Sequence, residues 1–291
     1  MKILLTGASG KLGKEVLAII PEAVPLVRRE CGLKNEIITD FSKKELEKIL
    51  QNADVIIHLA GSMNFDNRNE LRETNIGLTW NIVNCSPERT KIIFASSISV
   101  YGKKPVPLPI IESTPVAPDS EYSRSKEEAE EIVKRKKNHV ILRIGTVYGP
   151  QFPDYQKMLK LLAKGRLFLV GTGNNHLPFV HVKDVALAIV SSVAKGAGIY
   201  VLTGECKTQK EIYGIAAEQL GVKPPVFQMP VALARVFLQF FGGKTFTSEH
   251  IAVLSSDRIF DCSKAKKELG FTPCPIEDGI KEIAATIRSK T

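Results

Sequence analysis

A tyrosine and a lysine four residues apart, Tyr122 and Lys126, form the pair in this sequence best suited to proton transfer. Helix-forming residues follow as far as position 137, and a helix places side chains four residues apart on one face. A cation held beside a phenol favours the phenolate and lowers the pKa of the tyrosine from about 10. The pair therefore predicts a general acid/base that works near neutral pH.

A glycine-rich turn near the N-terminus predicts a phosphate-binding site. The segment TGASGKLG at 6–13 follows an apolar run at 2–6 and precedes a helical pattern at 14–20. In this layout backbone N–H groups and a helix N-terminus face a phosphate. Gly7 permits the turn, Gly10 admits a pyrophosphate, and Gly13 lets the helix pack closely. We expect a dinucleotide to contact Gly7, Ser9, Gly10, Lys11, Leu12 and Gly13, although the spacing is GxxGxxG rather than GxGxxG.

Two arginines indicate which dinucleotide is bound. Arg28 and Arg29 follow the predicted strand 24–27, where an NAD site usually carries an acid for the ribose 2′-hydroxyl. Guanidinium groups suit a 2′-phosphate instead. Glu30 comes next and could act as a displaced acid. The sequence therefore favours NADP and leaves NAD possible.

The ends of two further predicted strands complete the expected cofactor site. The strand 36–39 ends at Asp40 and Phe41, where a carboxylate could contact the adenine. The apolar strand 54–59 ends at Leu59, Ala60 and Gly61, whose small residues would let a ribose lie against the backbone. We expect His58, within that strand, to be structural.

Strands and helices alternate through the first half of the chain, which is typical of an α/β fold with a doubly wound parallel sheet of the Rossmann type. We assign residues 1–150 to a dinucleotide-binding domain, to which 180–203 return. Residues 151–179 and 204–291 would mainly form a smaller interleaved α/β substrate lobe. The segment 103–118 holds five prolines and is expected to be a loop over a cleft.

The composition argues for a globular protein that acts on a small molecule. The 291 residues are 44% hydrophobic and 24% charged, with a net charge of +9. Because the lysines are scattered, we interpret the charge as a solvated surface and expect no nucleic-acid partner.

The five cysteines show neither CxxC nor zinc-like spacing, so we expect a reducing compartment and no metal. We recognise no signal peptide, and polar residues interrupt the apolar stretch 224–242, so a cytoplasmic location without an integral membrane segment is predicted.

Several motifs occur together in a recognisable order. They are Thr6-Gly7-x-x-Gly10-x-x-Gly13, His58-Leu59-Ala60-Gly61, Ser96-Ser97-x-x-Val100-Tyr101-Gly102, Tyr122-x-x-x-Lys126 and Leu142-Arg143-x-x-x-Val147-Tyr148-Gly149-Pro150. Together they resemble the extended short-chain dehydrogenase/reductase family, which includes the NAD-dependent epimerases and dehydratases. The resemblance continues through 179–186 and 261–273, and so covers nearly the whole chain.

The resemblance implies a role for each matched residue. Tyr122 corresponds to the family's general acid/base, and Lys126 to the lysine that lowers its pKa and holds the nicotinamide ribose. Ser97 matches the hydroxyl that hydrogen-bonds the reacting oxygen, and Asn75 stands where the family often has a supporting asparagine. The resemblance also implies a homodimer, formed through the helices expected at 67–85 and 121–137.

Departures from the family pattern narrow the reaction. Ile98 and Ser99 replace the acid pair of the dehydratases, and neither can transfer protons in that role. Thr146 and Leu177 stand where sugar-nucleotide epimerases usually carry an anion-binding asparagine and arginine. Lys157, Lys160, Arg166 or Arg258 could substitute for those groups.

The segments 171–180 and 229–238 resemble the hydroxysteroid-dehydrogenase and dihydroflavonol-reductase-like branch. We expect an amphipathic helix at 229–238, used for core packing, an apolar cleft wall, or a partner or membrane-surface contact.

Three functions remain open from the sequence. The leading hypothesis is an NAD(P)-dependent oxidoreductase that interconverts a secondary alcohol and a ketone. The second is a sugar-nucleotide C4-epimerase with tightly bound NAD. The third is a non-catalytic NADP-binding regulatory or assembly protein, against which the intact Ser97, Tyr122 and Lys126 argue. None of these sequence patterns identifies the substrate.

Overall fold

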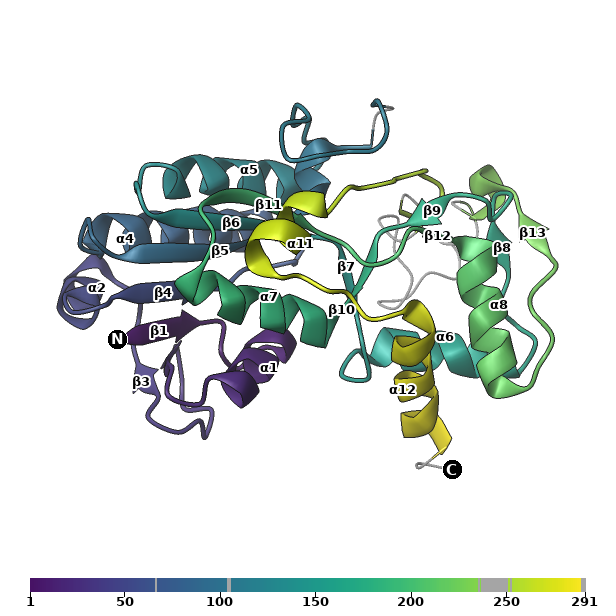
Figure 1. The fold of residues 1–291 in the computed structure, drawn as a ribbon, viewed down its shortest axis with the longest axis horizontal. Helices are drawn as coiled ribbons and strands as arrows, with labels where there is room; N and C mark the ends of the chain where they lie inside the picture. Colours follow the sequence, from purple (N-terminus) through teal and green to yellow (C-terminus); the bar gives the residue numbers. More distant parts are fainter. Residues whose placement is uncertain (66, 104–105, 235, 237–250, 252, 289–291) are drawn as a thin grey trace.

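A seven-stranded parallel sheet forms the centre of the larger half of the molecule (Figure 1). The computed structural model describes residues 1–65, 67–103, 106–234, 236, 251 and 253–288. The strands lie in the order β11-β6-β5-β4-β1-β2-β3. Their bounds are β1 (Ile3–Thr6), β2 (Val24–Val27), β3 (Ile37–Ile38), β4 (Val55–His58), β5 (Lys91–Ser97), β6 (His139–Ile144) and β11 (Gly198–Leu202). The chain reverses direction across the sheet between β1 and β4, which is where ligands bind in such folds.

Apolar residues alternate between the two faces of this sheet, and helices cover each face. Leu5, with its neighbours in β4 and β5, packs against α1 (Lys11–Ile19) and α7 (Val182–Ala194). Leu4, one residue earlier, faces α2 (Lys43–Leu50), α4 (Leu78–Cys85) and α5 (Glu121–Val133). Successive strand residues point to opposite faces, so runs of Ile, Leu and Val bury both. The predicted Rossmann-type class is confirmed.

Two helix ends differ from the sequence-based expectation. Ser42 with Glu45 three residues later is a pattern that predicts a capping box, and this prediction is wrong. Glu45 instead accepts hydrogen bonds from the Thr39 hydroxyl (2.6 Å) and the Asp40 N–H (2.9 Å). Helix α5 ends at Val133, four residues before position 137, to which the helix-forming residues extend. The residues beyond its end, 134–137, are rich in lysine. Lys136 in that run is buried and donates to the carbonyl of Ser86 at 2.7 Å.

A smaller lobe lies beyond one end of the sheet (Figure 1). It is built on α6 (Pro153–Ala163), α8 (Gln209–Leu220) and α12 (Ile276–Arg288), which share an apolar core of their own. Short strand pairs complete it: β8 (Leu169–Val170) with β13 (Gln228–Met229), and β9 (His176–Leu177) with β12 (Lys207–Thr208). A further pair, β7 (Thr146–Tyr148) and β10 (Phe179–His181), precedes α7.

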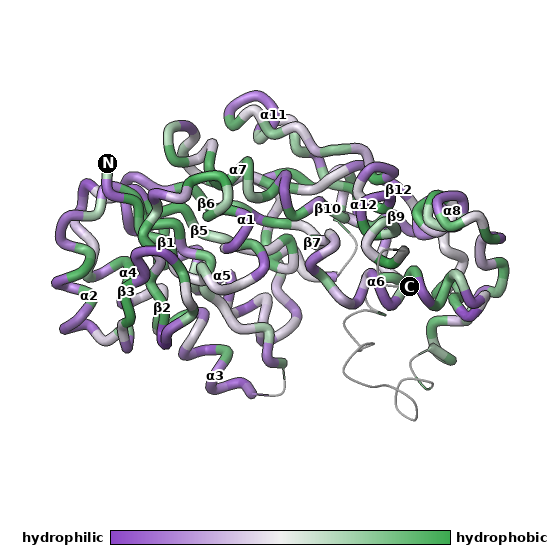
Figure 2. The backbone as a smooth tube through the Cα atoms, turned by 90° about the horizontal axis from the view of Figure 1, so that it is seen from below, coloured by the Kyte–Doolittle hydropathy of each residue, from purple (hydrophilic) through white to green (hydrophobic). Residues whose placement is uncertain are grey.

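The lobes interleave along the sequence. Helix α11 (Ser263–Leu269) packs against β11 and α7, so part of the C-terminal segment assigned to the substrate lobe lies on the main sheet. Figure 2 shows hydrophobic colour along the strands of the sheet, whereas α3 (Arg68–Arg72) is hydrophilic. Within the described residues, no helix is long and apolar enough to cross a membrane. The helix expected at 229–238 lies only partly within those residues.

Candidate active site

The three residues with the strongest chemical prediction meet at the carboxyl end of β5. Ser97 ends this strand, and its hydroxyl forms a hydrogen bond with the phenol of Tyr122, which is in the first turn of α5. One helical turn later, the Lys126 ammonium donates to the carbonyl of Ala95 at 2.8 Å. It also lies 4.8 Å from the ring centroid of Phe94. Strand β5 therefore holds both the phenol and the ammonium.

Burial dominates the titration of this pair. Burial raises the pKa of Tyr122, while the hydrogen bond with Ser97 lowers it. Burial also lowers the pKa of Lys126 to about 8, against the attraction of Glu130, which raises it. The net direction for Tyr122 is opposite to the predicted one. The reason is that the phenol is desolvated and the ammonium is directed to a backbone carbonyl.

Asn75 is held by a local distortion of its helix. The residues 73–77 form a π-helical turn, η1 (Glu73–Gly77), between α3 and α4. Asn75 is 1% exposed and accepts from the N–H of Ser62 at 2.7 Å. Its amide donates to the carbonyl of Ser62 (3.1 Å) and to the hydroxyl of Ser125 (2.9 Å). Such turns occur frequently at functional sites, and this one brings Asn75 to α5, the helix that carries Tyr122 and Lys126.

Gly61 connects the end of β4 to these residues. A Cβ atom at Gly61 would lie 3.1 Å from the Asn75 side-chain oxygen and 3.3 Å from the Lys126 ammonium. The predicted small residue is thus adjacent to both polar groups, and even an alanine would crowd them. Leu59 and Ala60, which precede it, are partly buried.

The glycine turn packs tightly against the same strand end. A Cβ at Gly7, where φ is 73°, would lie 2.7 Å from the backbone of Leu59 and Ala60. A Cβ at Gly13 would lie 2.3 Å from the carbonyl oxygen of Gly7. Gly10 is the exposed N-cap of α1. These glycines leave backbone groups accessible at a helix N-terminus, which fits the pyrophosphate of a dinucleotide.

The other predicted cofactor residues surround this turn. Ser9 and Lys11 are exposed beside it, and Leu12 is partly buried. Arg28 and Arg29 are exposed directly after β2, the neighbour of β1 in the sheet. The arginines therefore flank the turn on the side where an adenine ribose would lie.

Asp40 and Phe41 differ from each other in accessibility. The exposed Asp40 carboxylate accepts from the N–H of Ser42 at 2.7 Å, and this hydrogen bond lowers its pKa. The ring of Phe41 is 7% exposed and packs in the core, and φ is 60° at this residue. Any contact between Phe41 and a cofactor is therefore restricted to its backbone.

His58 is a structural residue, as its strand position predicted. Its ring is fully buried, with Nδ1 2.7 Å from the hydroxyl of Thr6 and Nε2 2.9 Å from that of Thr79. Burial lowers the pKa of His58 to about 3, with a further contribution from the charge of Lys126. The ring is thus neutral and links β1, β4 and α4.

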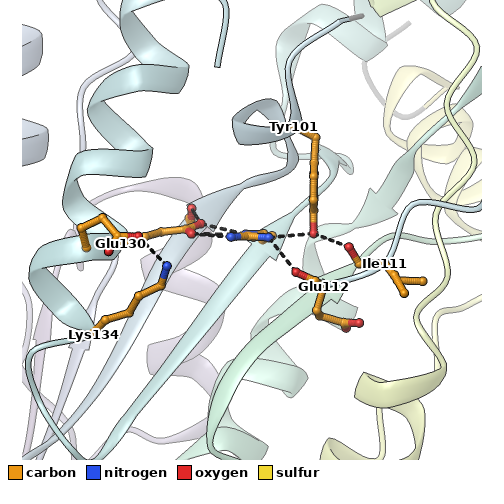
Figure 3. A network of polar contacts seen from close by, with 8 residues as sticks. Tyr101, Ile111, Glu112, Glu130 and Lys134 are labelled. Carbon is orange, nitrogen blue, oxygen red and sulfur yellow. Dashed lines mark hydrogen bonds and ion pairs between the residues drawn. The ribbon is translucent and has the colours of Figure 1, made fainter. Parts of the chain in front are cut away.

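A buried polar network behind the active site was not anticipated from the sequence (Figure 3). Arg143 of β6 lies between Glu130 of α5 and Tyr101, which follows β5. A related contact removes one suggested anion-binding group: the guanidinium of Arg258 donates to the carbonyl of Gly102 and stacks over Phe260. No local sequence signal identified these partners, because they are far apart in the chain.

An exposed aromatic side chain lies beside Tyr122. The ring of Phe65 is 43% exposed and meets the ring of Tyr122 edge-on, with 5.8 Å between centroids. Met63, two residues earlier, is 66% exposed. The segment after β4 therefore presents apolar surface next to the phenol.

His181, Asp184 and Cys274 form a cluster of metal-ligand types whose ligand atoms lie within 4.8 Å of one another. Asp184 accepts from the N–H of Cys274 at 2.9 Å. Burial, together with the Asp184 carboxylate, raises the pKa of the Cys274 thiol to about 12. We therefore interpret the cluster as a structural contact: the protonated thiol of Cys274, just before α12, is hydrogen-bonded to the carboxylate of Asp184 in α7.

Comparison with known proteins agrees with this geometry. The model of the NAD dependent epimerase/dehydratase family matches residues 3–202. The chain belongs to this family. It is 28% identical over 281 residues to the 3beta-hydroxysteroid-dehydrogenase/decarboxylase isoform 1 of Arabidopsis thaliana, covering 82% of this chain and 63% of that protein. A putative UDP-glucose 4-epimerase of Methanocaldococcus jannaschii is 30% identical over 254 residues, covering 76% and 83%.

The fold of this family member matches solved structures over its whole length. The UDP-glucuronic acid 4-epimerase from Bacillus cereus in complex with NAD superimposes with a TM-score of 0.77 at 22% identity, covering 100% of this chain and 99% of that one. The chain spans only 63% and 49% of the two Arabidopsis relatives that it matches. The comparisons therefore establish the family of this chain.

Proposed function

We propose that this family member is an NAD(P)-dependent oxidoreductase that interconverts a secondary alcohol and a ketone. The observation that carries the proposal is the convergence of Ser97, Tyr122 and Lys126 at the end of β5, next to the glycine turn. Bound NAD(P) supplies the group that accepts or releases the hydride of the carbinol carbon. The protein must then place a proton-transfer group on the oxygen of the same carbinol.

Each residue has a defined task in this proposal. In the reduction direction, the protonated Tyr122, the form that burial favours, gives a proton to the ketone oxygen. In oxidation, its phenolate form takes the hydroxyl proton of the alcohol. Ser97 hydrogen-bonds that oxygen and fixes its position. Lys126 is charged below a pKa of about 8 and so supplies a cation near the phenol in the neutral range. Asn75 and Gly61 define the wall beside the ammonium.

An apolar substrate suits the surface beside the phenol. Phe65 and Met63 border Tyr122 with exposed apolar side chains. The two anion-binding groups expected for a sugar diphosphate are replaced by Thr146 and Leu177, and Leu177 is 1% exposed. These features favour a hydroxysteroid-like or other apolar alcohol, as acted on by the Arabidopsis relatives according to their name.

The second candidate is a sugar-nucleotide 4-epimerase. It is supported by the identity to the M. jannaschii protein, which is itself a putative UDP-glucose 4-epimerase. In this reaction the same Tyr122 would serve both the oxidation and the reduction on one carbon. The nucleotide would then stay bound through the cycle.

One experiment separates the two candidates. Nucleotide released from the purified protein is quantified, and the protein is then assayed against hydroxysteroids, small secondary alcohols and UDP-sugars with added NAD(P). We expect substoichiometric nucleotide and net NAD(P)H formation with an apolar alcohol. Stoichiometric bound NAD, with interconversion of UDP-sugars and no net NAD(P)H, would contradict the oxidoreductase proposal.

NADP is the cofactor that we propose, because two exposed guanidiniums follow β2. The exposed faces of α4 and α5 support a homodimer contact. Trp80 is 44% exposed there and lies 4.6 Å from the guanidinium of Arg135. The five free cysteines support a cytoplasmic location.

A further inference from the structure

Three consecutive residues of β5 contact three residues of α5 that are spaced by four. The carbonyl of Ala95 accepts from the Lys126 ammonium at 2.8 Å, and the hydroxyl of Ser97 bonds the phenol of Tyr122. Between them, the hydroxyl of Ser96 donates to the carboxylate of Glu130 at 2.5 Å. Positions 122, 126 and 130 lie one turn apart on a single face of the helix. Two of the three contacts involve the proposed catalytic pair, and the third involves a carboxylate that the mechanism does not yet use.

Glu130 is fixed in a single orientation. It is 1% exposed, and both of its oxygens accept from Arg143, at 3.0 Å from Nε to Oε1 and 2.7 Å from Nη2 to Oε2. Arg143 is itself 3% exposed. A buried carboxylate is stable only when it is paired and hydrogen-bonded, and this one has partners on two strands. Its position on α5 is therefore determined by β5 and β6 together.

The network continues into the loop that follows the active-site strand (Figure 3). Arg143 Nη1 donates to the phenol oxygen of Tyr101 at 2.9 Å and to the carbonyl of Glu112 at 3.1 Å. The hydroxyl of Tyr101 donates to the carbonyl of Ile111 at 2.9 Å. Contacts with the loop after β5, made through Arg143, therefore hold Glu130 in place in addition to its contacts with β5 and β6.

We propose that Glu130 is a positioning residue, which holds β5 against α5 so that Ser97, Tyr122 and Lys126 keep their arrangement for proton transfer. This inference rests on the proposed function of those three residues. The ionisable groups around Lys126 are Glu130 and Tyr122 on α5 and His58 on β4, with Arg143 of β6 paired to Glu130. His58 is neutral above a pKa of about 3, so Glu130 is the anion that acts on the ammonium.

The test is a titration that needs neither substrate nor turnover. The intact protein is labelled with ¹³C at the lysine ε and tyrosine ζ carbons, and its resonances are followed by NMR against pH. Lys126→Ala and Tyr122→Phe assign the two signals. In the unsubstituted protein, the Lys126 signal should titrate near pH 8. In Glu130→Gln the midpoint should fall by about one pH unit or more, because the opposite charge is lost.

Three further variants make the test decisive. Glu131→Gln is the matched control, since Glu131 is the next residue, is exposed and pairs only with Lys134 among the described ion pairs. It should leave both midpoints unchanged. Ser96→Ala keeps the carboxylate but removes its bond to β5, and should raise the Tyr122 midpoint as the Ser97 hydrogen bond weakens. Ser96→Thr, which keeps the hydroxyl, should restore it.

Unchanged Lys126 and Tyr122 midpoints in folded Glu130→Gln and Ser96→Ala would overturn the proposal. If Glu130→Gln fails to fold, the Ser96 pair alone decides the outcome. Absence of turnover with every alcohol tested would remove the proposed function but would leave these titrations readable, so the two failures are distinguishable.

Discussion

Polar contacts concentrate where β5 meets α5, whereas the lobe built on α6, α8 and α12 is held together by apolar packing. At the first place, the ammonium of Lys126 and the carboxylate of Glu130 each bond to a specific atom of β5. At the second, Leu159, Ile212 and Ile280 share a core in which many combinations of apolar residues would fit. This difference explains what each part of the sequence can predict. Polar residues at fixed spacing, such as Tyr122 and Lys126, indicate a type of reaction, whereas the apolar residues of the smaller lobe indicate only that they form a core.

Burial also acts differently on the ionisable groups of the two regions. In the larger half, the buried Arg143 is charged and paired, and the pKa of this guanidinium is raised by Glu130 despite the opposing effect of burial. In the smaller lobe, burial raises the pKa of the phenols of Tyr155 and Tyr213, so both remain neutral. Charge is thus retained beside the proposed reaction and absent from these two core positions. Three substitutions test whether the two regions differ in this way, and they follow from the largest expected effect to the smallest.

The largest effect is expected from a single added carbon in the glycine turn. Gly13→Ala should lower the free energy of unfolding by about 3 kcal/mol, because its Cβ would lie 2.3 Å from a backbone oxygen. NADH binding should weaken as well. Gly214→Ala in α8 is the matched control: among the described residues, no atom outside its own helical turn lies within 4 Å of its Cβ, so a gain of about 0.5–1 kcal/mol is expected. Urea unfolding measures the free energy of unfolding, and NADH fluorescence titration measures nucleotide binding. If Gly13→Ala and Gly214→Ala changed these two quantities equally, the proposed difference between the glycine turn and α8 would be refuted.

A pH-dependent effect is expected from His58. Its pKa falls from 6.5 to about 3 on folding, so between these values the unfolded chain binds one more proton than the native protein. Stability should therefore decline as pH falls through this window, by about 1.4 kcal/mol per pH unit from this residue. His58→Gln should flatten the dependence of unfolding free energy on pH between 6 and 4 by about that slope. A slope identical to that of the parent protein would contradict the buried, neutral assignment.

The smallest effect concerns cofactor choice. Arg28→Ala should weaken NADPH binding by about tenfold, since one guanidinium contact to a phosphate is lost, and should leave NADH binding nearly unchanged. Arg166→Ala, an exposed arginine after α6 in the other lobe, controls for the loss of general positive charge. Equal losses for the two nucleotides would remove the argument for NADP.

Much of the fold and part of the site followed from the sequence for physical reasons. Apolar strands that alternate with helical patterns predict a doubly wound parallel sheet, and Tyr122 and Lys126 are four apart on one helix. The arrangement of Asn75 did not follow, because it depends on a π-helical turn and on Ser125, 50 residues away. The direction of the Tyr122 pKa was wrong because desolvation depends on packing that spacing does not describe.

Phe65 illustrates the same limit for specificity. An aromatic residue in a loop carries no sequence signal of its own, and only the tertiary structure brings its ring to 5.8 Å from that of Tyr122. The sequence thus predicts the place of site residues that lie at fixed spacing on one helix or turn. It does not predict which side chains border the substrate, because loops bring those side chains to the site.

The central claim is that Tyr122 transfers the proton of the reacting alcohol. The most direct measurement compares hydride transfer by the parent protein and Tyr122→Phe, with NAD(P) and the alcohol identified from the substrate panel, alongside NADPH binding to both. If Tyr122 transfers this proton, the variant should lose about 10²–10⁴-fold in kcat and keep its nucleotide affinity unchanged. A Tyr122→Phe variant that turns over within a few-fold of the parent rate would contradict it.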